Sequence, residues 1–340
     1  MQEEREMDLV AVEPLPHDLI VAREQRRDQN AAIVYLASLA PGSRRTMGDA
    51  LGIIAGLLLP ELREKTVQVR IELLPWGALR FQHTSAVRAV LAEKYSYATV
   101  NKMLSALRGT IKTAWRLGQL SAEDYQRAVD VQRVQGETLP AGRSLKTGEI
   151  AALIDVCQKD RSAVGARDAA IVALLYGCGL RRAELAALSL GDYDPEEGVV
   201  KILGKRNKQR LVPVVGGAQA ALDAWVLMRG DSPGALLLPS RKGGKLVRDA
   251  GASGELLGMT AQALYLILIE RAREAGVVHF SPHDFRRTFV GDLLDRGADI
   301  ATVQKLAGHA NVTTTARYDR RGEAAKRKAA ELLHVPFRKV

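Results

Sequence analysis

The chain is poor in cysteine, and this excludes two common ways of stabilising a small fold. Its 340 residues include only two cysteines, Cys157 and Cys178. A single pair cannot build a disulfide framework, and these two are too far apart for the CxxC clamp of a zinc site. We therefore predict that both are small, buried apolar side chains of a protein in a reducing compartment.

The chain also lacks a hydrophobic run of membrane-spanning length. Its longest apolar stretch, 51–59, is far shorter than the roughly 18 residues that a spanning helix requires. The N-terminus, MQEERE, has no basic start followed by an apolar stretch, so it does not read as a secretion signal. These absences predict a cytoplasmic protein with no membrane partner.

Three common site motifs are missing, although fragments of them occur. The stretch 198–206 has five residues between its glycines and ends in arginine, whereas a P-loop has four and ends in serine or threonine. The stretch 177–182 lacks the third glycine of a dinucleotide-binding turn. His279 and His283 are interrupted by a Ser-Pro pair and have no third ligand at a useful spacing. We expect no nucleotide cofactor and no metal.

Acidic residues are in the minority, which favours a polyanionic partner. Forty-nine lysines and arginines against 39 aspartates and glutamates give a net charge of +10. Residues 1–18 carry six acids and one arginine, whereas 19–135 carry seventeen bases and ten acids, and 136–340 carry thirty-one bases and twenty-three acids. Clustered cations gain affinity for nucleic acids by releasing counterions. The charge alone is equally consistent with a protein that is merely kept soluble.

The apolar pattern predicts two domains, because 340 residues exceed the usual size of one domain. Residues 1–18, acidic and with two prolines, predict a flexible tail. The domain 19–135 is predicted to be wholly helical, since apolar residues recur every three or four positions. The predicted helices are 31–39, 46–59, 85–94, 97–117 and 122–134.

The second domain, 146–340, follows a linker predicted at 136–145 from its proline and glycines. Helical patterns begin at Thr147 and recur at 167–176, before 190, and at 218–228, 260–275, 283–296, 300–306, 312–318 and 322–333. The only clear β signal is a hairpin, 198–203 and 210–215, around a polar turn. The predicted fold class is mainly α with a small β-sheet.

Four segments of the second domain bear the side chains that phosphoryl transfer without a metal requires: cations for the phosphorane oxygens, a general acid and a nucleophile. They are GLRRAE at 179–184, LGKRNK at 203–208, PHDFR at 282–286, and LAGH at 306–309 followed by Tyr318. Taken singly, each has an ordinary explanation as a surface ion pair, a solvated lysine, a structural histidine or a packed tyrosine. Their combination and order change that interpretation.

All four segments resemble the motif boxes of the tyrosine recombinase (phage integrase, Xer-type) family. YGCGLRRAELAAL at 176–188 is similar to the first arginine box, and SPHDFRRTF at 281–289 to the His-x-x-Arg box. GADIATVQKLAGHANVTTTARY at 297–318 resembles the nucleophile region throughout. The resemblance is strong over 147–320 and weaker over the first domain, and it implies a helical core-binding domain followed by an α/β catalytic domain.

The resemblance implies a role for each matched cation. Arg181 and Arg286 would hold the non-bridging oxygens of the scissile phosphate, for which guanidinium forks are well shaped. Lys205 would protonate the departing 5′ oxygen. Arg206 stands where related turns often have glycine, and Lys208 is a second candidate for the acid, although Lys205 is favoured.

The remaining matched residues surround the nucleophile. Tyr318 would form the covalent bond to phosphate, and the cationic pocket would make its phenol reactive near neutral pH. His283 would manage the phenolic proton, and His309 would donate a further hydrogen bond to phosphate. Glu184 would orient the catalytic side chains without contacting the phosphate itself.

A basic helical face predicts DNA contacts in the first domain. In 97–117 one stripe is apolar and comprises Val100, Leu104, Leu107, Ile111 and Trp115. The other faces carry the candidate DNA-binding residues Lys102, Arg108, Lys112 and Arg116, to which the turn residues Arg206 and Lys208 and the box residue Arg287 are added.

The resemblance thus implies a site-specific recombinase that cuts double-stranded DNA core sites through a 3′-phosphotyrosyl intermediate and a Holliday junction. It needs no cofactor, because the phosphotyrosyl ester retains the energy of the broken bond. Four copies would assemble on two sites at the nucleoid, with the helix 322–333 of each docked on a neighbour. The sequence does not identify the target DNA or any accessory protein.

Two alternatives stay open. A type IB topoisomerase resembles this family in its active-site residues but relaxes DNA as a monomer, and the two-domain layout with a helical tail disfavours it. A DNA-binding architectural protein without activity is disfavoured because every reactive position is filled.

Overall fold

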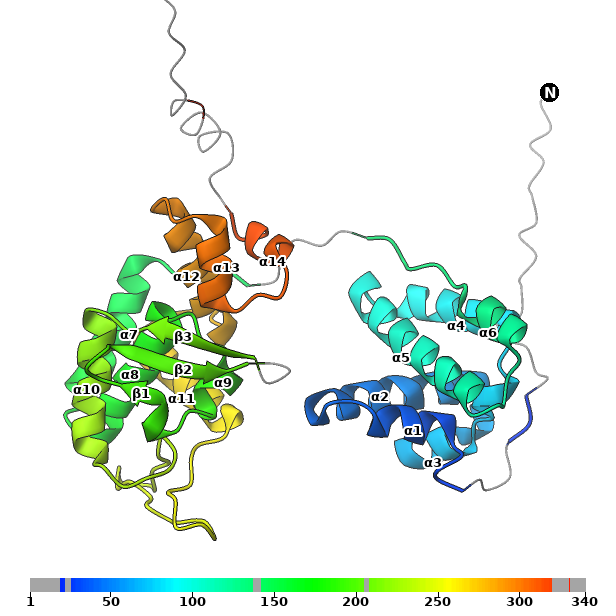
Figure 1. Ribbon diagram of the computed structural model, residues 1–340, viewed down its shortest axis with the longest axis horizontal. Coiled ribbons are helices and arrows are strands. Elements are labelled where there is room, and N and C mark those ends of the chain that lie inside the picture. The colour runs from blue at the N-terminus through cyan, green and yellow to red at the C-terminus, as the bar shows by residue number, and fades with distance from the viewer. Residues whose placement is uncertain (1–18, 22–25, 137–141, 205–207, 320–329, 331–340) are drawn as a thin grey trace, which may run out of the picture. The chain divides into compact units, whose positions relative to one another are not determined.

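The computed structural model describes residues 19–21, 26–136, 142–204, 208–319 and 330. The chain forms two compact units that divide between Leu139 and Pro140, and both are visible in Figure 1. This division falls inside the segment 136–145 that the sequence indicates as a linker. The tail predicted at 1–18 lies outside the described residues.

The described part of the first unit is helical and contains no strand. Its helices are α1 (Ala31–Ala37), α2 (Pro41–Leu58), α3 (Val67–Leu73), α4 (Phe81–Lys94), α5 (Tyr97–Arg116) and α6 (Ala122–Val129), with 3₁₀ turns at Pro60–Leu62 and Trp76–Ala78. The sequence pattern did not indicate α3, which is short and begins where the hydroxyl of Thr66 accepts from the backbone N–H of Val69. Helix α6 ends at Val129, well before residue 134.

Helix α5 is the central element of this unit, since it packs against α1, α2, α4 and α6. Four members of its predicted stripe, Val100, Leu104, Leu107 and Ile111, are buried. Trp115 is not: it is 38% exposed, and its ring stacks on Tyr125 of α6 with ring centres 5.1 Å apart. The apolar stripe is thus buried at four of its five positions, and Trp115 at its end is only partly covered.

The second unit is mainly helical with a small sheet, as the sequence predicts. Its helices are α7 (Thr147–Lys159), α8 (Ala163–Gly177), α9 (Arg182–Ala186), α10 (Gly217–Arg229), α11 (Ala261–Glu274), α12 (Pro282–Asp295), α13 (Ile300–Ala307) and α14 (Val312–Ala316), with a 3₁₀ turn at Leu190–Asp192. Strands β1 (Tyr193–Asp194), β2 (Val199–Leu203) and β3 (Gln209–Pro213) form an antiparallel sheet in the order β1-β2-β3. The helix predicted at 322–333 lies outside the described residues except for Ala330.

Helix α8 forms the centre of the second unit. It is apolar on nearly all sides, as expected of a helix without a solvent-facing surface, and α7, α10, α11 and α12 all pack against it (Figure 1). Both cysteines are buried, as predicted, and burial raises the pKa of each thiol to about 12, which makes them poor nucleophiles.

The chain enters the second unit along the helix that bears two of the candidate catalytic residues. The backbone N–H of Arg143 donates to Asp284 Oδ1 at 3.0 Å, and that of Leu145 donates to Thr288 Oγ1 at 2.8 Å. Gly142 has φ +87°, and a Cβ there would lie 2.4 Å from Asp284 Oδ1, so only glycine fits. Residues 142–145, assigned to the linker from sequence, are attached to α12.

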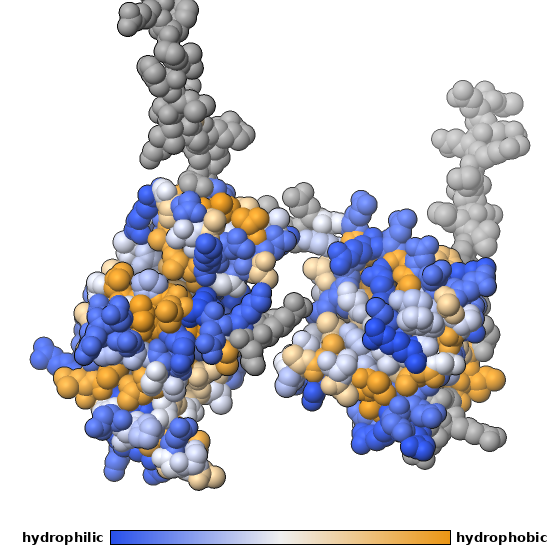
Figure 2. All heavy atoms as spheres, viewed as in Figure 1, coloured by the Kyte–Doolittle hydropathy of each residue, from blue (hydrophilic) through white to orange (hydrophobic). Residues whose placement is uncertain are grey.

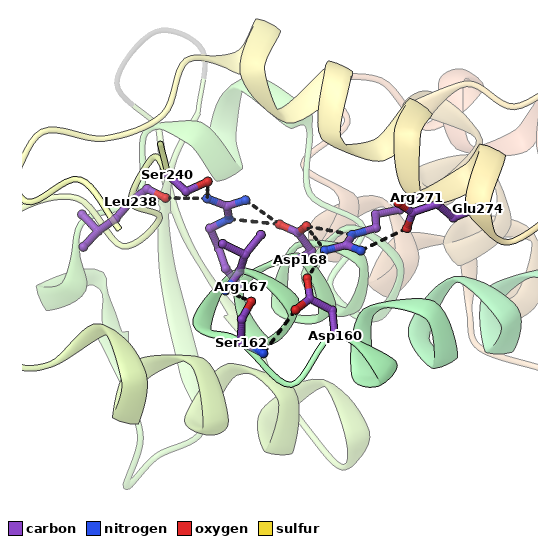
Figure 3. Close-up of polar contacts among 9 residues, drawn as sticks. Asp160, Ser162, Arg167, Asp168, Leu238, Ser240, Arg271 and Glu274 are labelled. Carbon is purple, nitrogen blue, oxygen red and sulfur yellow. Dashed lines mark hydrogen bonds and ion pairs between the residues drawn. The ribbon is translucent and has the colours of Figure 1, made fainter. Parts of the chain in front are cut away.

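A buried charge network joins three parts of the second unit (Figure 3). Arg167 and Asp168 are almost fully buried on α8, and Arg271 of α11 pairs with Asp168 at 2.9 Å and with Asp160 at 2.7 Å. Arg167 also donates to the carbonyl oxygen of Leu238 at 3.0 Å, which ties the loop before α11 to α8. Because buried guanidinium groups must be compensated, Asp168 holds two of them in place.

Replacing Asp168 by alanine is expected to lower the free energy of unfolding by about 3–5 kcal/mol, the cost of leaving buried cations without their partner. Urea unfolding at neutral pH measures it. The matched control is Glu270→Ala, which removes an exposed carboxylate paired with Arg273 at 2.5 Å and should leave the free energy of unfolding nearly unchanged. Equal losses in the two variants would contradict a structural role for the network.

Candidate active site

The structure brings together most of the residues that the motif boxes single out. Arg181 and Glu184 lie at the start of α9, His283 and Arg286 in the first turns of α12, His309 after α13, and Tyr318 after α14. The apolar cluster that fixes α12 against α13 includes Phe289, Val290, Leu294, Val303 and Ala307, and the ring of Tyr318 packs on it. Lys205 and Arg206 lie outside the described residues.

Glu184 is the most highly connected acid of the site. Its carboxylate accepts from the guanidinium of Arg181 at 2.6 Å and from that of Arg210 at 2.9 and 3.2 Å, and it also accepts from the backbone N–H of Arg181 at 2.9 Å. Burial alone would raise the pKa of Glu184, but the hydrogen bonds from Arg210 and Arg181 lower it to about 2. The carboxylate is therefore ionised and holds both arginines in fixed orientations.

Arg210 belongs to none of the four motif segments, yet its guanidinium is fixed at the site by Glu184. It lies on β3 opposite Ile202, and its Nε also donates to the carbonyl oxygen of Leu306 at 3.2 Å. The sequence carries a signal for its burial, because Arg210 lies two residues before the inward-facing Val212 and therefore on the same face of the strand. A cation at such a position needs a buried acid.

Gly308 allows α13 to end against these arginines. It has φ +63°, and its carbonyl oxygen accepts from Arg181 at 3.1 Å. A Cβ at this position would lie 2.8 Å from the guanidinium of Arg210, so any larger residue would displace it. The glycine before His309 thus sets the distance between α13 and the arginine pair.

Arg286 is the buried cation of the site, with 1% of its surface exposed. It donates to the carbonyl oxygen of Gly179 at 2.7 Å and to that of Ala307, so two segments share one guanidinium. Burial first, and the nearby charge of Arg181 second, lower the pKa of Arg286 to about 10. It remains charged at neutral pH, beside the half-exposed Arg181.

The phenol of Tyr318 lies within reach of a histidine. Tyr318 Oη and His283 Nε2 are 3.3 Å apart, and the guanidinium of Arg287 lies 5.2 Å from the centre of the Tyr318 ring. Desolvation, followed by the charges of Arg286 and Arg287, lowers the pKa of His283 below its usual value. A neutral imidazole at this distance can accept the phenolic proton.

His309 packs against the ring of the same tyrosine. Its ring stacks on that of Tyr318 with centres 6.1 Å apart, and its Nδ1 is 2.8 Å from Thr315 Oγ1. Burial, followed by the charges of Arg286 and Arg181, lowers the pKa of His309 to about 4, so the imidazole is neutral near pH 7. When Thr315 donates to Nδ1, the proton is on Nε2, which can donate to an anion.

The predicted DNA-binding residues lie in different environments. Lys102, Lys112 and Arg116 of α5 are exposed, as is Lys208 at the end of the β2–β3 turn. Arg108 is half-buried, and its guanidinium donates to the carbonyl oxygens of Val129 and Val131. Arg108 thus fastens the end of α6, and a DNA contact for it stays a prediction.

A pocket of about 390 Å³ opens beside the cluster. Arg181, His283 and Arg286 line one part of it, and Arg182 and Tyr265 line another. Fixed guanidinium groups, neutral imidazoles and a phenol can bind a phosphate and exchange one of its ester bonds. In the part of the chain that the structure describes, no three acids, histidines or cysteines are grouped to hold a metal, and no helix is long and apolar enough to span a membrane.

Comparison with known proteins identifies relatives over most of the chain. The model of the phage integrase family matches residues 143–324. Tyrosine recombinase XerD of Pseudomonas aeruginosa is 34% identical over 234 residues, covering 67% of this chain and 72% of that protein. Tyrosine recombinase XerC of the same species is 32% identical over 332 residues, covering 89% of this chain and 97% of that protein.

Solved structures with a similar fold come from the same kind of protein. The Tn1549 transposon integrase in complex with transposon right end DNA has a TM-score of 0.63 at 18% identity, covering 89% of this chain and 99% of that one. XerH recombinase bound to a palindromic difH substrate has a TM-score of 0.58 at 20% identity, covering 92% and 91%. At these identities the likeness concerns the fold.

Proposed function

Because the chain belongs to the phage integrase family of tyrosine recombinases, we propose that Tyr318 is the nucleophile with which it cuts DNA. The protein is a site-specific DNA recombinase, an enzyme that breaks and rejoins DNA strands. The observation that carries the choice of nucleophile is the 3.3 Å contact between Tyr318 Oη and His283 Nε2, beside two fixed arginines.

In the proposed first step, Tyr318 Oη forms a bond to the scissile phosphorus and the bond from phosphorus to the 5′ oxygen breaks. His283 accepts the phenolic proton at Nε2, for which its lowered pKa leaves it neutral. Lys205 donates a proton to the departing 5′ oxygen, which leaves as a hydroxyl group. The product is a 3′-phosphotyrosyl ester and a free 5′ end.

The charge that grows on the phosphate is met by groups already in position. Arg181 and Arg286 bind the non-bridging oxygens, and the carboxylate of Glu184 keeps Arg181 oriented. His309 adds a hydrogen bond from Nε2. Preorganised donors of this kind typically contribute several kcal/mol to such a transition state, because they need no reorganisation as the charge develops.

Rejoining is the same exchange in reverse. A 5′-hydroxyl attacks the phosphotyrosine, and the proton returns to Tyr318. One phosphodiester replaces another, so no cofactor enters the balance. When the attacking hydroxyl comes from a second DNA site, the product is a Holliday junction. The named relatives, Xer recombinases and a transposon integrase, support an enzyme of the Xer or mobile-element type.

The proposed substrate is double-stranded DNA carrying a core site, which would place the protein at the nucleoid. Solved structures with a similar fold contain transposon right end DNA in one case and a palindromic difH substrate in another. The exposed cations Lys102, Lys112 and Arg116 would contact phosphates from the first unit, and Arg206, Lys208 and Arg287 from the second. These contacts position the duplex without reading its sequence.

We propose further that four copies act together on two sites, each placing its helix 322–333 on a neighbour. An apolar groove of about 780 Å³ lies between α7, α8 and α10 and offers a place for it. Small side chains, among them Ala169, Ala173 and Ala224, line this groove, and the tail helix presents alanines and leucines. In Figure 2 apolar surface interrupts the hydrophilic one over α10, where Met228, which also lines the groove, is exposed.

Recombination between two sites tests both proposals. DNA trapped covalently on the protein is sequenced to find the core site, and pairs of that site are then supplied. The full chain should exchange strands, whereas a chain that ends at Gly322 should bind one site and cleave a nicked substrate weakly but form no junctions, because subunit contact is lost. Relaxation of supercoiled DNA without any sequence requirement would instead support a topoisomerase, and binding without an adduct an inactive DNA-binding protein.

A pair of substitutions on one helix separates docking from general damage. Ala224→Glu places a charge in the groove and should reproduce the loss of junctions. Leu227→Glu, at an exposed position of α10 outside the groove lining, should recombine at the normal rate. A shortened chain that recombines as fast as the full one would disprove the exchange of tails.

A further inference from the structure

A second arginine, immediately after Arg181, has no assigned role. Arg182 begins α9 and is half-buried, and its guanidinium carbon lies 5.1 Å from the centre of the Tyr265 ring on α11. Within the described ranges no carboxylate lies within ion-pair distance of it and its side chain makes no hydrogen bond. Among the residues that the structure describes, the aromatic face of Tyr265 is thus the one partner of this partly desolvated cation.

The other arginines of this region differ from Arg182 in this respect. Arg181 and Arg210 share the carboxylate of Glu184, and Arg286 donates to two backbone carbonyls. An aromatic face attracts a guanidinium group without using its N–H donors, so none of the five donors of Arg182 is occupied by another described residue. The arrangement is suited to an anion that arrives from outside the chain.

The position of Arg182 indicates which anion that is. Arg182 and Tyr265 line the same 390 Å³ pocket as Arg181, His283 and Arg286. Neighbouring phosphates of one DNA strand are separated by a single sugar unit, a distance that the side chains of two arginines lining one pocket can span. A strand whose scissile phosphate lies at Arg181 therefore presents its neighbouring phosphate near Arg182.

We infer that Arg182 binds the phosphate adjacent to the scissile one on the cleaved strand, and that Tyr265 is a positioning residue that holds the guanidinium toward it. The inference rests on the proposal that Arg181 and Arg286 hold the scissile phosphate. It gives α11 a part in aligning the strand: two neighbouring phosphates held by consecutive residues fix the direction of the backbone as well as the place of the cut.

Binding measured over a series of salt concentrations gives the first test. Arg182→Ala should weaken binding of a core-site duplex about tenfold or more, and should reduce the slope of log affinity against log salt by about 0.9, the value for one phosphate contact. Arg273→Ala is the matched control, since Arg273 is an exposed arginine of α11 paired with Glu270, and should change affinity less than about twofold. An unchanged slope in Arg182→Ala would overturn the inference.

Neutralising single phosphates identifies the partner. A methylphosphonate beside the scissile position should weaken binding by the full-length protein but have little further effect on Arg182→Ala, because the contact is already lost. If the two losses simply add at both flanking positions, Arg182 does not bind there. The readout is binding and not cleavage. A failure of the inference about Arg182 can therefore be told apart from a failure of the proposed role of Arg181, which Arg181→Ala tests separately.

Two substitutions of Tyr265 test whether its aromatic ring positions Arg182. Tyr265→Phe keeps the aromatic face and should bind DNA like the unchanged protein, whereas Tyr265→Leu removes it and should shift affinity and salt slope toward those of Arg182→Ala. Circular dichroism of each variant checks folding. Equal affinities for the phenylalanine and leucine variants would reject the positioning role.

Discussion

Tyr318→Phe is expected to bind core-site DNA as tightly as the unchanged protein and to form no covalent complex. The substitution removes only the hydroxyl group that contacts His283, while the ring keeps its packing on the α12–α13 cluster, its stacking on His309 and its contact with Arg287. Cleavage should fall at least about a thousandfold, the scale on which loss of a nucleophile acts.

The measurement is the protein–DNA adduct formed on a nicked suicide substrate and separated under denaturing conditions, with affinity recorded in parallel. Tyr193→Phe is the matched control, because it deletes the hydroxyl of another tyrosine of the second unit, the buried Tyr193 of β1, which donates to Asp223 of α10 at 2.6 Å. It should retain the adduct. An adduct that persists in Tyr318→Phe would show that another residue is the nucleophile.

Lys205→Ala is expected to slow cleavage of ordinary DNA by about a hundred- to ten-thousandfold, the usual contribution of a general acid. A substrate with sulfur at the 5′ bridging position should restore the rate, because a thiolate leaves without protonation. The assignment of Lys205 as the acid depends on the β2–β3 hairpin. The pairing of its two strands ends at Leu203 and Gln209, and the N–H of Gly204 donates to the carbonyl oxygen of Lys208 at 2.8 Å.

Lys208→Ala separates the two lysines of the turn. Its side chain is exposed at the foot of β3, and its loss should weaken DNA binding while leaving the response to sulfur unchanged. Rescue of Lys208→Ala by the sulfur substrate, with Lys205→Ala still inactive, would reverse the assignment. Cleavage rates on both substrates, under single-turnover conditions, decide between the lysines.

The parts of the fold that sequence predicted are those with strong local signals. Helix α5 has a long apolar period, and the hairpin has two β-rich runs around a polar turn, so both were located closely. Helix α3 was missed because seven residues give too little of a period, and its burial depends on packing against α2. Trp115 belongs to the apolar stripe of α5 but stays 38% exposed, because periodicity shows which residues share a face and not how far a neighbouring helix covers it.

The residues of the candidate site also fall into two groups, those that a local sequence signal identifies and those that it does not. Arg181, His283, Arg286, His309 and Tyr318 could be named from their motif boxes, since each box is a contiguous stretch of chain. Their partners could not. The bond from Arg210 to Glu184 and the contact of Arg182 with Tyr265 join positions far apart in sequence, and no local pattern encodes such a pairing.

The attachment of residues 142–145 to α12 has a mechanical consequence. The backbone N–H of Arg143 donates a hydrogen bond to Asp284, which lies between His283 and Arg286. The backbone N–H of Leu145 donates one to Thr288, one turn further along α12. A pull on the chain at this point would therefore act directly on the helix that bears two of the candidate catalytic side chains. The start of the second unit thus works as a tether fixed to the candidate site.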